Sequence, residues 1–143
     1  MTNKRFNIFE YLVPKNSTSY LNQETTVRQA LEKFDYHKFS VVPIISNDGD
    51  YIGSISEGDL LRFIKNVHNF NLKEGEKFTL KDISLYRSYK PLTVDATIEE
   101  IMVLSLDQNF IPVLDDRHKY IGIIKRRTII QYLMKNVNDN KNN

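Results

Sequence analysis

The chain of 143 residues contains no cysteine, and it has only five glycines and four prolines. Without cysteine the protein cannot have a disulfide framework, and no thiolate is available to bind a metal ion. No apolar run approaches the roughly 20 residues that a membrane-spanning helix requires. The basic residues at the N-terminus are not followed by the apolar segment that is typical of a signal peptide. These absences predict a cytoplasmic protein that does not associate with a membrane.

The chain also has no large excess of positive or negative charge, since its formal net charge is only +2. A protein that binds the phosphate backbone of a nucleic acid usually has a broad basic surface. Here the basic residues gather only at Lys4 and Arg5 and at residues 125–127. We therefore expect no nucleic-acid partner. The hydrophobic fraction of 41% is sufficient for a packed core in one domain or in two half-size units.

The most informative feature that is present is an internal repeat. Residues 41–64 match residues 110–133 without a gap, at an offset of 69 residues. Three pairs of identical residues mark the match: Pro43 and Pro112, Tyr51 and Tyr120, and Gly53 and Gly122. Self-similarity at a fixed spacing indicates that one supersecondary unit is used twice. Ligands bind in clefts between such copies, so positions where the copies differ are candidates for function.

Each copy has the pattern of a β-α-β-β-α unit. A short extended stretch (residues 18–21 and 91–94) precedes a helix whose apolar residues recur at i, i+3, i+4 and i+7. A continuous apolar run then predicts a strand that is buried on both faces. A polar turn, a second strand and a second helix, at residues 57–66 and 126–134, complete the copies. The predicted fold class is α/β of the α+β type, built from two such repeats.

The same pattern divides the chain into four segments. We expect the first repeat to span residues 8–66 and the second repeat to span residues 80–134. Residues 67–79 are mostly polar, which predicts a surface linker. Residues 135–143 are polar and rich in asparagine, which predicts a disordered tail.

In both copies a strand with two hydrophobic residues before a proline is followed by a strand with an aromatic residue, isoleucine and glycine. In the first copy, residues 53–59 then lead into a helix. With these motifs the chain resembles a tandem pair of CBS domains (the cystathionine-β-synthase type) over about residues 8–134. The resemblance implies two sheets related by a pseudo-twofold axis, in a module that usually forms a homodimer. It also implies a stand-alone regulator that binds adenosine-containing nucleotides and signals to a protein partner not yet identified.

The resemblance further implies that each nucleotide cleft takes residues from both copies. The strands of one copy flank the adenine, and the start of the last helix of the other copy holds the ribose and the phosphates. A helix N-terminus suits an anion because its backbone N–H groups are free and the dipole is positive there.

The first predicted cleft takes its phosphate side from Ser56 and Asp59, which match the Ser/Thr-x-x-Asp motif of the family. Its adenine side is expected at Pro91, Asn109, Phe110 and Pro112. In the family the carboxylate accepts hydrogen bonds from the ribose and the hydroxyl contacts a phosphate. The alternative is that Ser56 and Asp59 only cap the helix, an arrangement that contributes about 1 kcal/mol.

The second predicted cleft takes its phosphate side from Lys125, Arg126, Arg127 and Thr128. Lys125 and Thr128 replace the Ser and Asp of the family motif, so the ribose-binding carboxylate is absent. Three cations at a helix start oppose the dipole, at a cost of about 0.3–1 kcal/mol each, which points to a polyanionic ligand. The adenine side is expected at the following residues: Ser19, Tyr20, Ser40, Val41 and Pro43.

The two arginines also resemble the arrangement in small stand-alone CBS proteins that bind cyclic di-AMP. The ligand of the module is therefore expected to be an adenine nucleotide, one of AMP, ADP, ATP or cyclic di-AMP. Cyclic di-AMP is the candidate for the second cleft, whereas AMP or ATP would suit the cleft of Ser56 and Asp59. The alternative is that residues 125–127 form a solvated basic surface that pairs with Asp115 and Asp116.

An enzyme is not predicted, and we assign no catalytic residue, metal or cofactor. His37, His68 and His118 are scattered, none has a nucleophile at a recognisable spacing, and no glycine-rich phosphate loop is present. Adjacent carboxylates in a turn, as at Asp115 and Asp116, more often favour the turn than bind a metal. A ligand-free scaffold that dimerises through residues 57–66 and 126–134 remains the alternative function, because these helices have surplus apolar surface.

Overall fold

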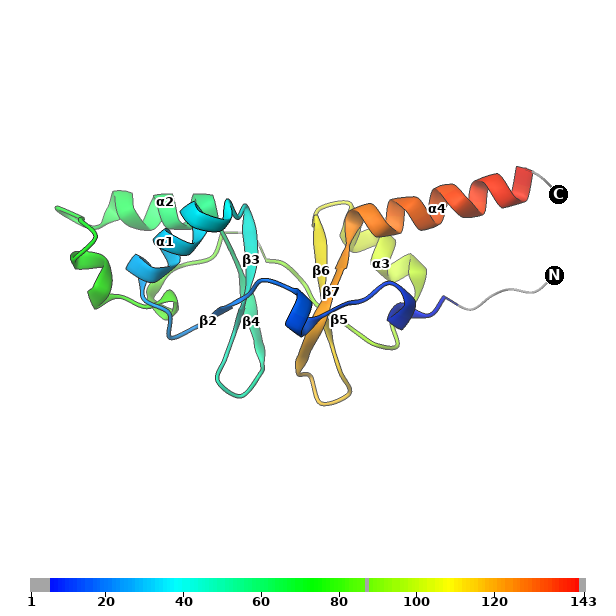
Figure 1. Cartoon of the computed structure of the whole chain (residues 1–143), viewed down its shortest axis with the longest axis horizontal. Helices are drawn as coiled ribbons and strands as arrows, with labels where there is room; N and C mark the ends of the chain where they lie inside the picture. The colour runs from blue at the N-terminus through cyan, green and yellow to red at the C-terminus, as the bar shows by residue number, and fades with distance from the viewer. Residues whose placement is uncertain (1–5, 87, 142–143) are drawn as a thin grey trace. The chain divides into compact units, whose positions relative to one another are not determined.

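The structure is a computed structural model, and it describes residues 6–86 and 88–141. The chain divides into two compact units, each of which contains one copy of the repeat (Figure 1). The first unit is Ser19–Ser88, and the second unit combines Met1–Thr18 with Tyr89–Asn143.

The first unit has a three-stranded sheet with the order β2-β3-β4. Its elements are β2 (Leu21–Asn22), α1 (Val27–His37), β3 (Val41–Ile45), β4 (Tyr51–Ser56) and α2 (Glu57–Asn66), followed by the 3₁₀ helices η3 (Glu74–Lys77) and η4 (Leu80–Asp82). Strand β2 is parallel to β3, and β3 is antiparallel to β4. The apolar periodicity of α1 buries Val27, Ala30 and Phe34 in a core that also contains Ile55 and Leu60.

The second unit has a four-stranded sheet with the order β1-β7-β6-β5. Its elements are η1 (Ile8–Glu10), β1 (Val13–Pro14), η2 (Lys15–Ser17), β5 (Leu92–Thr93), α3 (Ile98–Ser105), β6 (Phe110–Leu114), β7 (Tyr120–Lys125) and α4 (Arg126–Lys141). Strand β5 is parallel to β6, and β6 is antiparallel to β7. Ile101, Ile111, Val113, Ile124 and Ile129 form the centre of its core.

The register of the two hairpins confirms the repeat and the predicted fold class. Val41 pairs with Ser56 in the first unit, and Phe110 pairs with Lys125 in the second. Both hairpins have a register shift at the equivalent place, between Ile44 and Ile45 and between Val113 and Leu114. The offset of 69 residues is therefore preserved down to individual strand pairs.

The N-terminal residues pack with the second copy, whereas the sequence placed residues 8–12 at the beginning of the first. Ile8 is 3% exposed and belongs to the core of the second unit. Strand β1 pairs antiparallel with β7, with Pro14 opposite Gly122. The physical reason is that β7 has a free edge, and β1 satisfies the backbone groups of that edge.

Residues 67–79, which the sequence predicts to be a surface linker, pack against the first unit. Gly75 of η3 is buried against Arg28 of α1, and Arg28 Nη1 donates to Glu76 Oε1 at 2.6 Å. Phe70 and Phe78 pack against the core of the first unit. Two aromatic side chains are therefore sufficient to dock a segment whose remaining residues are mostly polar.

Helix α4 continues to Lys141, into residues 135–143 that the sequence predicts as a disordered tail. Once a helix is formed, each added residue gains a hydrogen bond without a new nucleation cost, so a polar extension can continue it. Residues 142–143 lie outside the described residues, as do Lys4 and Arg5.

The two hairpin turns differ at one position that requires a left-handed backbone. Gly49 has φ 87°, and its equivalent in the second copy is His118 with φ 63°. Their backbone N–H groups make the same turn contact, from Gly49 N to Ser46 O and from His118 N to Asp115 O, at 3.0 Å in each case. The second copy therefore holds a side chain in a conformation that disfavours one.

The variant His118→Gly is expected to raise the free energy of unfolding by about 0.5–1 kcal/mol, because the left-handed strain outweighs the entropy of the added glycine. The measurement is urea denaturation. Arg117→Gly in the same turn is the control. Arg117 is not among the described residues that have a positive φ, so glycine should lower the stability there. Equal losses from both variants would contradict the prediction.

Candidate functional site

The starts of α2 and α4 are equivalent places in the two copies. Each helix follows directly on the last strand of its copy. Glu57 N donates to Ser40 O, and Arg126 N donates to Asn109 O, both at 3.0 Å. The backbone of the two helix starts is therefore alike, and any difference in chemistry comes from the side chains.

At the start of α2, Asp59 is already bonded to three groups. Its Oδ2 accepts from Ser56 N at 2.9 Å, and Ser56 Oγ accepts from Asp59 N at 3.2 Å, which makes a capping box. The other oxygen, Oδ1, accepts from Arg62 Nη2 at 2.6 Å and from Tyr86 N at 2.9 Å. The Asp59 side chain is only 1% exposed.

This geometry leaves the Asp59 carboxylate about one acceptor position for a ribose hydroxyl. An ionised carboxylate has about four acceptor positions, and three are occupied here. The capping role that was the alternative at this motif is present, while the assignment of Asp59 to a ribose stays a prediction. Sequence reasoning missed Arg62 and Tyr86. The i, i+3 spacing of Asp59 and Arg62 was an available signal, whereas Tyr86, 27 residues from Asp59, gave none.

The start of α4 has the opposite charge. Lys125 and Arg127 are exposed, Arg126 is partly buried, and the first turn contains no acidic residue. Within the described ranges, no carboxylate makes an ion pair with any of these three cations. The cations therefore lie at the positive end of a helix dipole without local compensation from a carboxylate.

The proposed partners of these cations, Asp115 and Asp116, do not pair with them in the part of the chain that is described. Asp115 Oδ1 instead accepts from Lys119 N at 2.9 Å and from Arg117 N at 2.8 Å, inside its own turn. The hydrogen bond from the Lys119 N–H is the largest cause that lowers the pKa of Asp115 below its usual value. Asp115 thus shapes the hairpin turn, as expected from the sequence.

Gln108 positions Arg126, and sequence reasoning did not identify it. Arg126 Nε donates to Gln108 O at 3.1 Å. The Gln108 side chain is buried: its Oε1 accepts from Lys90 N at 2.8 Å, and its Nε2 donates to Lys90 O at 3.0 Å and to Phe110 O at 3.3 Å. The equivalent residue in the first copy is Phe39. A polar residue where the other copy has an aromatic one was the available signal.

The adenine-side residues of the first predicted cleft lie in the second unit. Phe110 is 7% exposed, and Pro112 is fully buried in β6. Asn109 Oδ1 accepts from Tyr89 Oη at 2.9 Å, and the Tyr89 and Phe110 rings lie 4.9 Å apart. Pro91 is half-buried just before β5. Asn109 and Phe110 are thus held together by Tyr89.

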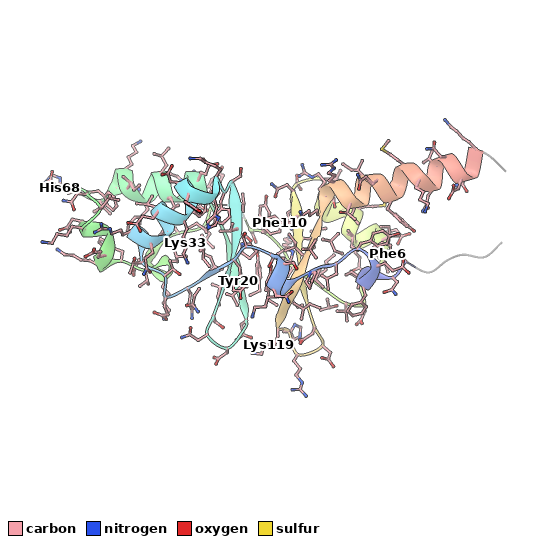
Figure 2. The ribbon with its side chains drawn as sticks, viewed as in Figure 1. Phe6, Tyr20, Lys33, His68, Phe110 and Lys119 are labelled. Carbon is pink, nitrogen blue, oxygen red and sulfur yellow. The ribbon has the colours of Figure 1, made fainter. Side chains whose placement is uncertain are left out.

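The adenine-side residues of the second predicted cleft lie in the first unit. Ser19 and Ser40 are exposed, Tyr20 is 40% exposed, Val41 is partly buried and Pro43 is buried. Figure 2 shows Tyr20 on the segment that leads into β2, and Phe110 at the start of β6. Each predicted cleft takes residues from both units, and the pairing of the two halves remains a prediction.

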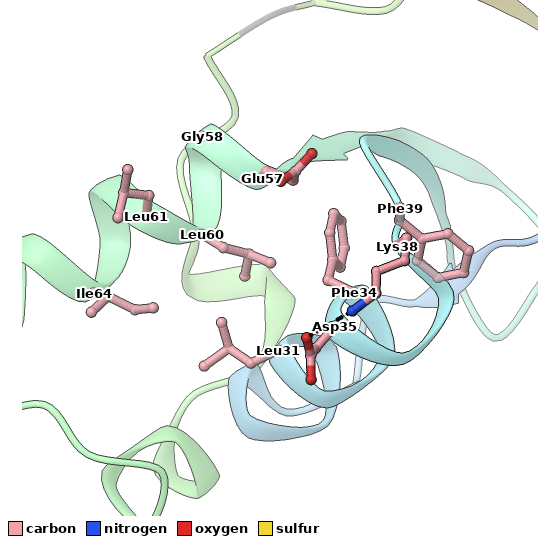
Figure 3. Close-up of a pocket in the computed structure, with 10 residues that line it drawn as sticks. All are labelled: Leu31, Phe34, Asp35, Lys38, Phe39, Glu57, Gly58, Leu60, Leu61 and Ile64. Carbon is pink, nitrogen blue, oxygen red and sulfur yellow. Dashed lines mark hydrogen bonds and ion pairs between the residues drawn. The ribbon is translucent and has the colours of Figure 1, made fainter.

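A separate groove lies within the first unit, between α1 and α2. It has a volume of about 610 Å³ and is lined mainly by apolar side chains. Figure 3 shows Leu31 and Leu60 facing the space between the two helices, with the ion pair of Asp35 and Lys38 at the rim. Leu61, which is one of the lining residues, is 67% exposed. None of the predicted ligand-binding residues lines this groove.

Two further features are absent from the described residues. No group of three or more His, Cys, Asp or Glu side chains is arranged to hold a metal ion. Over the same ranges, no helix combines the length and the apolar character that crossing a membrane would need.

Comparison with known proteins identifies the family. The model of the CBS domain matches residues 14–66 and 80–135, so the chain belongs to the CBS domain family. A CBS domain-containing protein of Dictyostelium discoideum is 26% identical over 121 residues, which are 80% of this chain and 83% of that protein. The resemblance stated from the two motifs and their repeat is therefore confirmed.

Solved structures of CBS domain proteins share the fold. CbpB in complex with c-di-AMP has a TM-score of 0.82 and 22% identity, over 96% of this chain and 90% of that one. Listeria monocytogenes CbpB in complex with c-di-AMP has a TM-score of 0.78 and 17% identity, over 93% and 98%. CBSX2 in complex with AMP has a TM-score of 0.68 and 20% identity, over 91% and 97%. At these identities the likeness establishes the fold alone.

Proposed function

We propose that this protein is a non-catalytic regulatory module that senses an adenine nucleotide, and that its phosphate site is the start of α4. Lys125, Arg126, Arg127 and the backbone of the first turn would bind the phosphates. Ser19, Tyr20, Ser40, Val41 and Pro43 would take the adenine. Cyclic di-AMP is the nucleotide that suits this site best.

The observation that carries the proposal is the set of three cations at the start of α4 that make no ion pair within the described residues. A phosphate there would be attracted by the helix dipole and by the cations together, so it would remove the repulsion between them. Cyclic di-AMP has two phosphate groups and no terminal phosphate. The c-di-AMP complexes of two CbpB structures with this fold support the choice of ligand.

A ligand of this kind can regulate a partner without catalysis. CBS domain proteins are generally regulatory modules, and the family match indicates no catalytic family. Neutralising the cations would favour one shape of the module over others, and a partner protein responds if it binds one shape better. The regulated partner is proposed to be a separate protein, and the cytoplasmic location remains a prediction.

Calorimetric titration with AMP, ADP, ATP and cyclic di-AMP at moderate salt tests the function. We expect micromolar or tighter binding of cyclic di-AMP, which corresponds to about −8 kcal/mol or better, and weaker binding of the others. A preference for AMP would favour the helix start of Ser56 and Asp59. No heat with any of the four nucleotides would overturn the proposal.

The groove between α1 and α2 favours a second candidate function, a ligand-free scaffold that binds another copy of the chain. The groove is mostly apolar, and Leu61, which lines it, is exposed. Exposed apolar patches of this kind are common where proteins associate. Sedimentation equilibrium would distinguish a monomer from a dimer. Homodimerisation and ligand binding are compatible, and the titration decides whether the scaffold is the whole function.

A further inference from the structure

Residues 83–86 are held on the first unit immediately before the chain leaves it. The first unit ends at Ser88, and the second unit resumes at Tyr89. Ile83 is 7% exposed, and Leu85 packs against the core of the first unit beside Gly53. Tyr86 N donates to Asp59 Oδ1 at 2.9 Å. The exit of the chain is therefore anchored by backbone and side-chain contacts.

Arg62 completes this anchor from one turn further along α2. Its Nη2 donates to the same Asp59 Oδ1 at 2.6 Å, and its guanidinium lies 4.8 Å from the centre of the Tyr86 ring. The three groups differ in exposure, at 1% for the Asp59 side chain, 49% for that of Arg62 and 77% for Tyr86. The buried carboxylate is thus the fixed point to which two more exposed residues are attached.

We propose that Asp59 and Arg62 form a latch that fixes residues 83–86 to α2. A buried carboxylate is stable only with enough hydrogen-bond donors, and Ser56 N, Arg62 and Tyr86 N supply them. A ribose has two hydroxyl groups for one remaining acceptor position. One ribose hydroxyl could donate to that position, and a second could reach the carboxylate only by displacing Tyr86 N or Arg62, which would release the exit of the chain.

The second copy lacks the two charged residues of the latch. The residues equivalent to Asp59 and Arg62 are Thr128 and Gln131, which cannot make a charged pair. Since the connecting segment follows only the first copy, one latch is sufficient. The inference goes beyond the proposed function, because the start of α4 plays no part in it.

Amide hydrogen exchange followed by NMR tests the latch in the full chain. In Asp59→Asn, the one side-chain oxygen cannot accept from both Ser56 N and Tyr86 N, and the amide cannot pair with Arg62. We expect exchange of the Tyr86 amide to be at least about tenfold faster, with the amides of β3 and β4 changed far less. Arg62→Met leaves the capping box intact and should accelerate Tyr86 about threefold.

Asp82→Asn is the matched control, since Asp82 Oδ2 accepts from Thr79 N in another capping box, and no hydrogen bond joins this box to Tyr86 among the described residues. It should leave Tyr86 exchange unchanged. The proposal is wrong if Tyr86 exchange is unaltered in Asp59→Asn and Arg62→Met, or if it rises only as much as that of the core amides. None of these results depends on binding of cyclic di-AMP at α4.

Discussion

Replacement of Arg126 and Arg127 together by alanine is expected to weaken cyclic di-AMP binding by about 10²–10³-fold. Hydrogen bonds to charged groups contribute about 1.5–3 kcal/mol each, and each arginine can grip a phosphate with two parallel donors. Arg126 is additionally held at its Nε by Gln108 O, so its orientation is set before a ligand arrives. The measurement is the calorimetric Kd of the double variant against that of the unaltered protein.

The same double variant is expected to fold normally. Removing two cations from the positive end of the α4 dipole relieves a repulsion of about 0.3–1 kcal/mol each. That gain offsets the loss of the hydrogen bond from Arg126 Nε to Gln108 O. A large loss of binding together with an unchanged denaturation midpoint is therefore the specific signature of a ligand-binding role.

The control for net charge is Lys33→Ala with Lys65→Ala, which removes two exposed cations from α1 and α2. This control should leave the Kd almost unchanged, because screened surface charges contribute little at moderate salt. If the arginine double variant binds cyclic di-AMP within threefold of the unaltered protein, the start of α4 is not the phosphate site.

Gly122→Ala is expected to lower the free energy of unfolding by about 2–5 kcal/mol. Gly122 has φ 154°, and a Cβ there would lie 2.0 Å from Val13 O and 3.0 Å from Val13 C. These are backbone atoms of β1, which pairs with β7 at this point, so no side-chain rotation can make room. Strand β1 would have to leave the edge of the sheet.

The equivalent glycine of the first copy provides the control for this prediction. A Cβ at Gly53 would meet only Leu85 Cδ1, at 2.6 Å, and the end of a leucine side chain can move. Gly53→Ala should therefore cost about 1 kcal/mol or less. Urea denaturation of both variants measures the difference, and similar losses would show that the close approach of β1 does not set the stability.

The repeat explains why so much of the fold could be predicted. Helix periodicity and apolar strands are local patterns, and an offset of 69 residues doubled the evidence for each. The capping boxes at Thr26, Ser56 and Thr97 follow from the same local logic, since each joins residues only three apart. The packing of Phe70 and Phe78 against the first unit could not be predicted from the average composition of residues 67–79, which is mostly polar.

Only part of the candidate site could likewise be predicted from the sequence. The three cations at the start of α4 could be recognised in the sequence, because positive charges are unfavourable at the N-terminus of a helix. The groups that surround them were not visible, since Gln108 is 18 residues from Arg126. Likewise, Ser56 and Asp59 were recognised as a motif, but the contact between Asp59 and Tyr86 joins residues 27 apart.

The sequence by itself determined the duplicated β-α-β-β-α unit, the family, and the contrast between an acidic and a basic helix start. Each of these is encoded by neighbouring residues or by comparison of one copy with the other. The tertiary structure alone decided that β1 completes the sheet of the second copy, that η3 docks on α1, and that Asp59 holds Tyr86. Such contacts form because strand edges and buried carboxylates that have no local partner must find one elsewhere in the chain. That partner can be distant in the sequence, so a local sequence pattern does not reveal it.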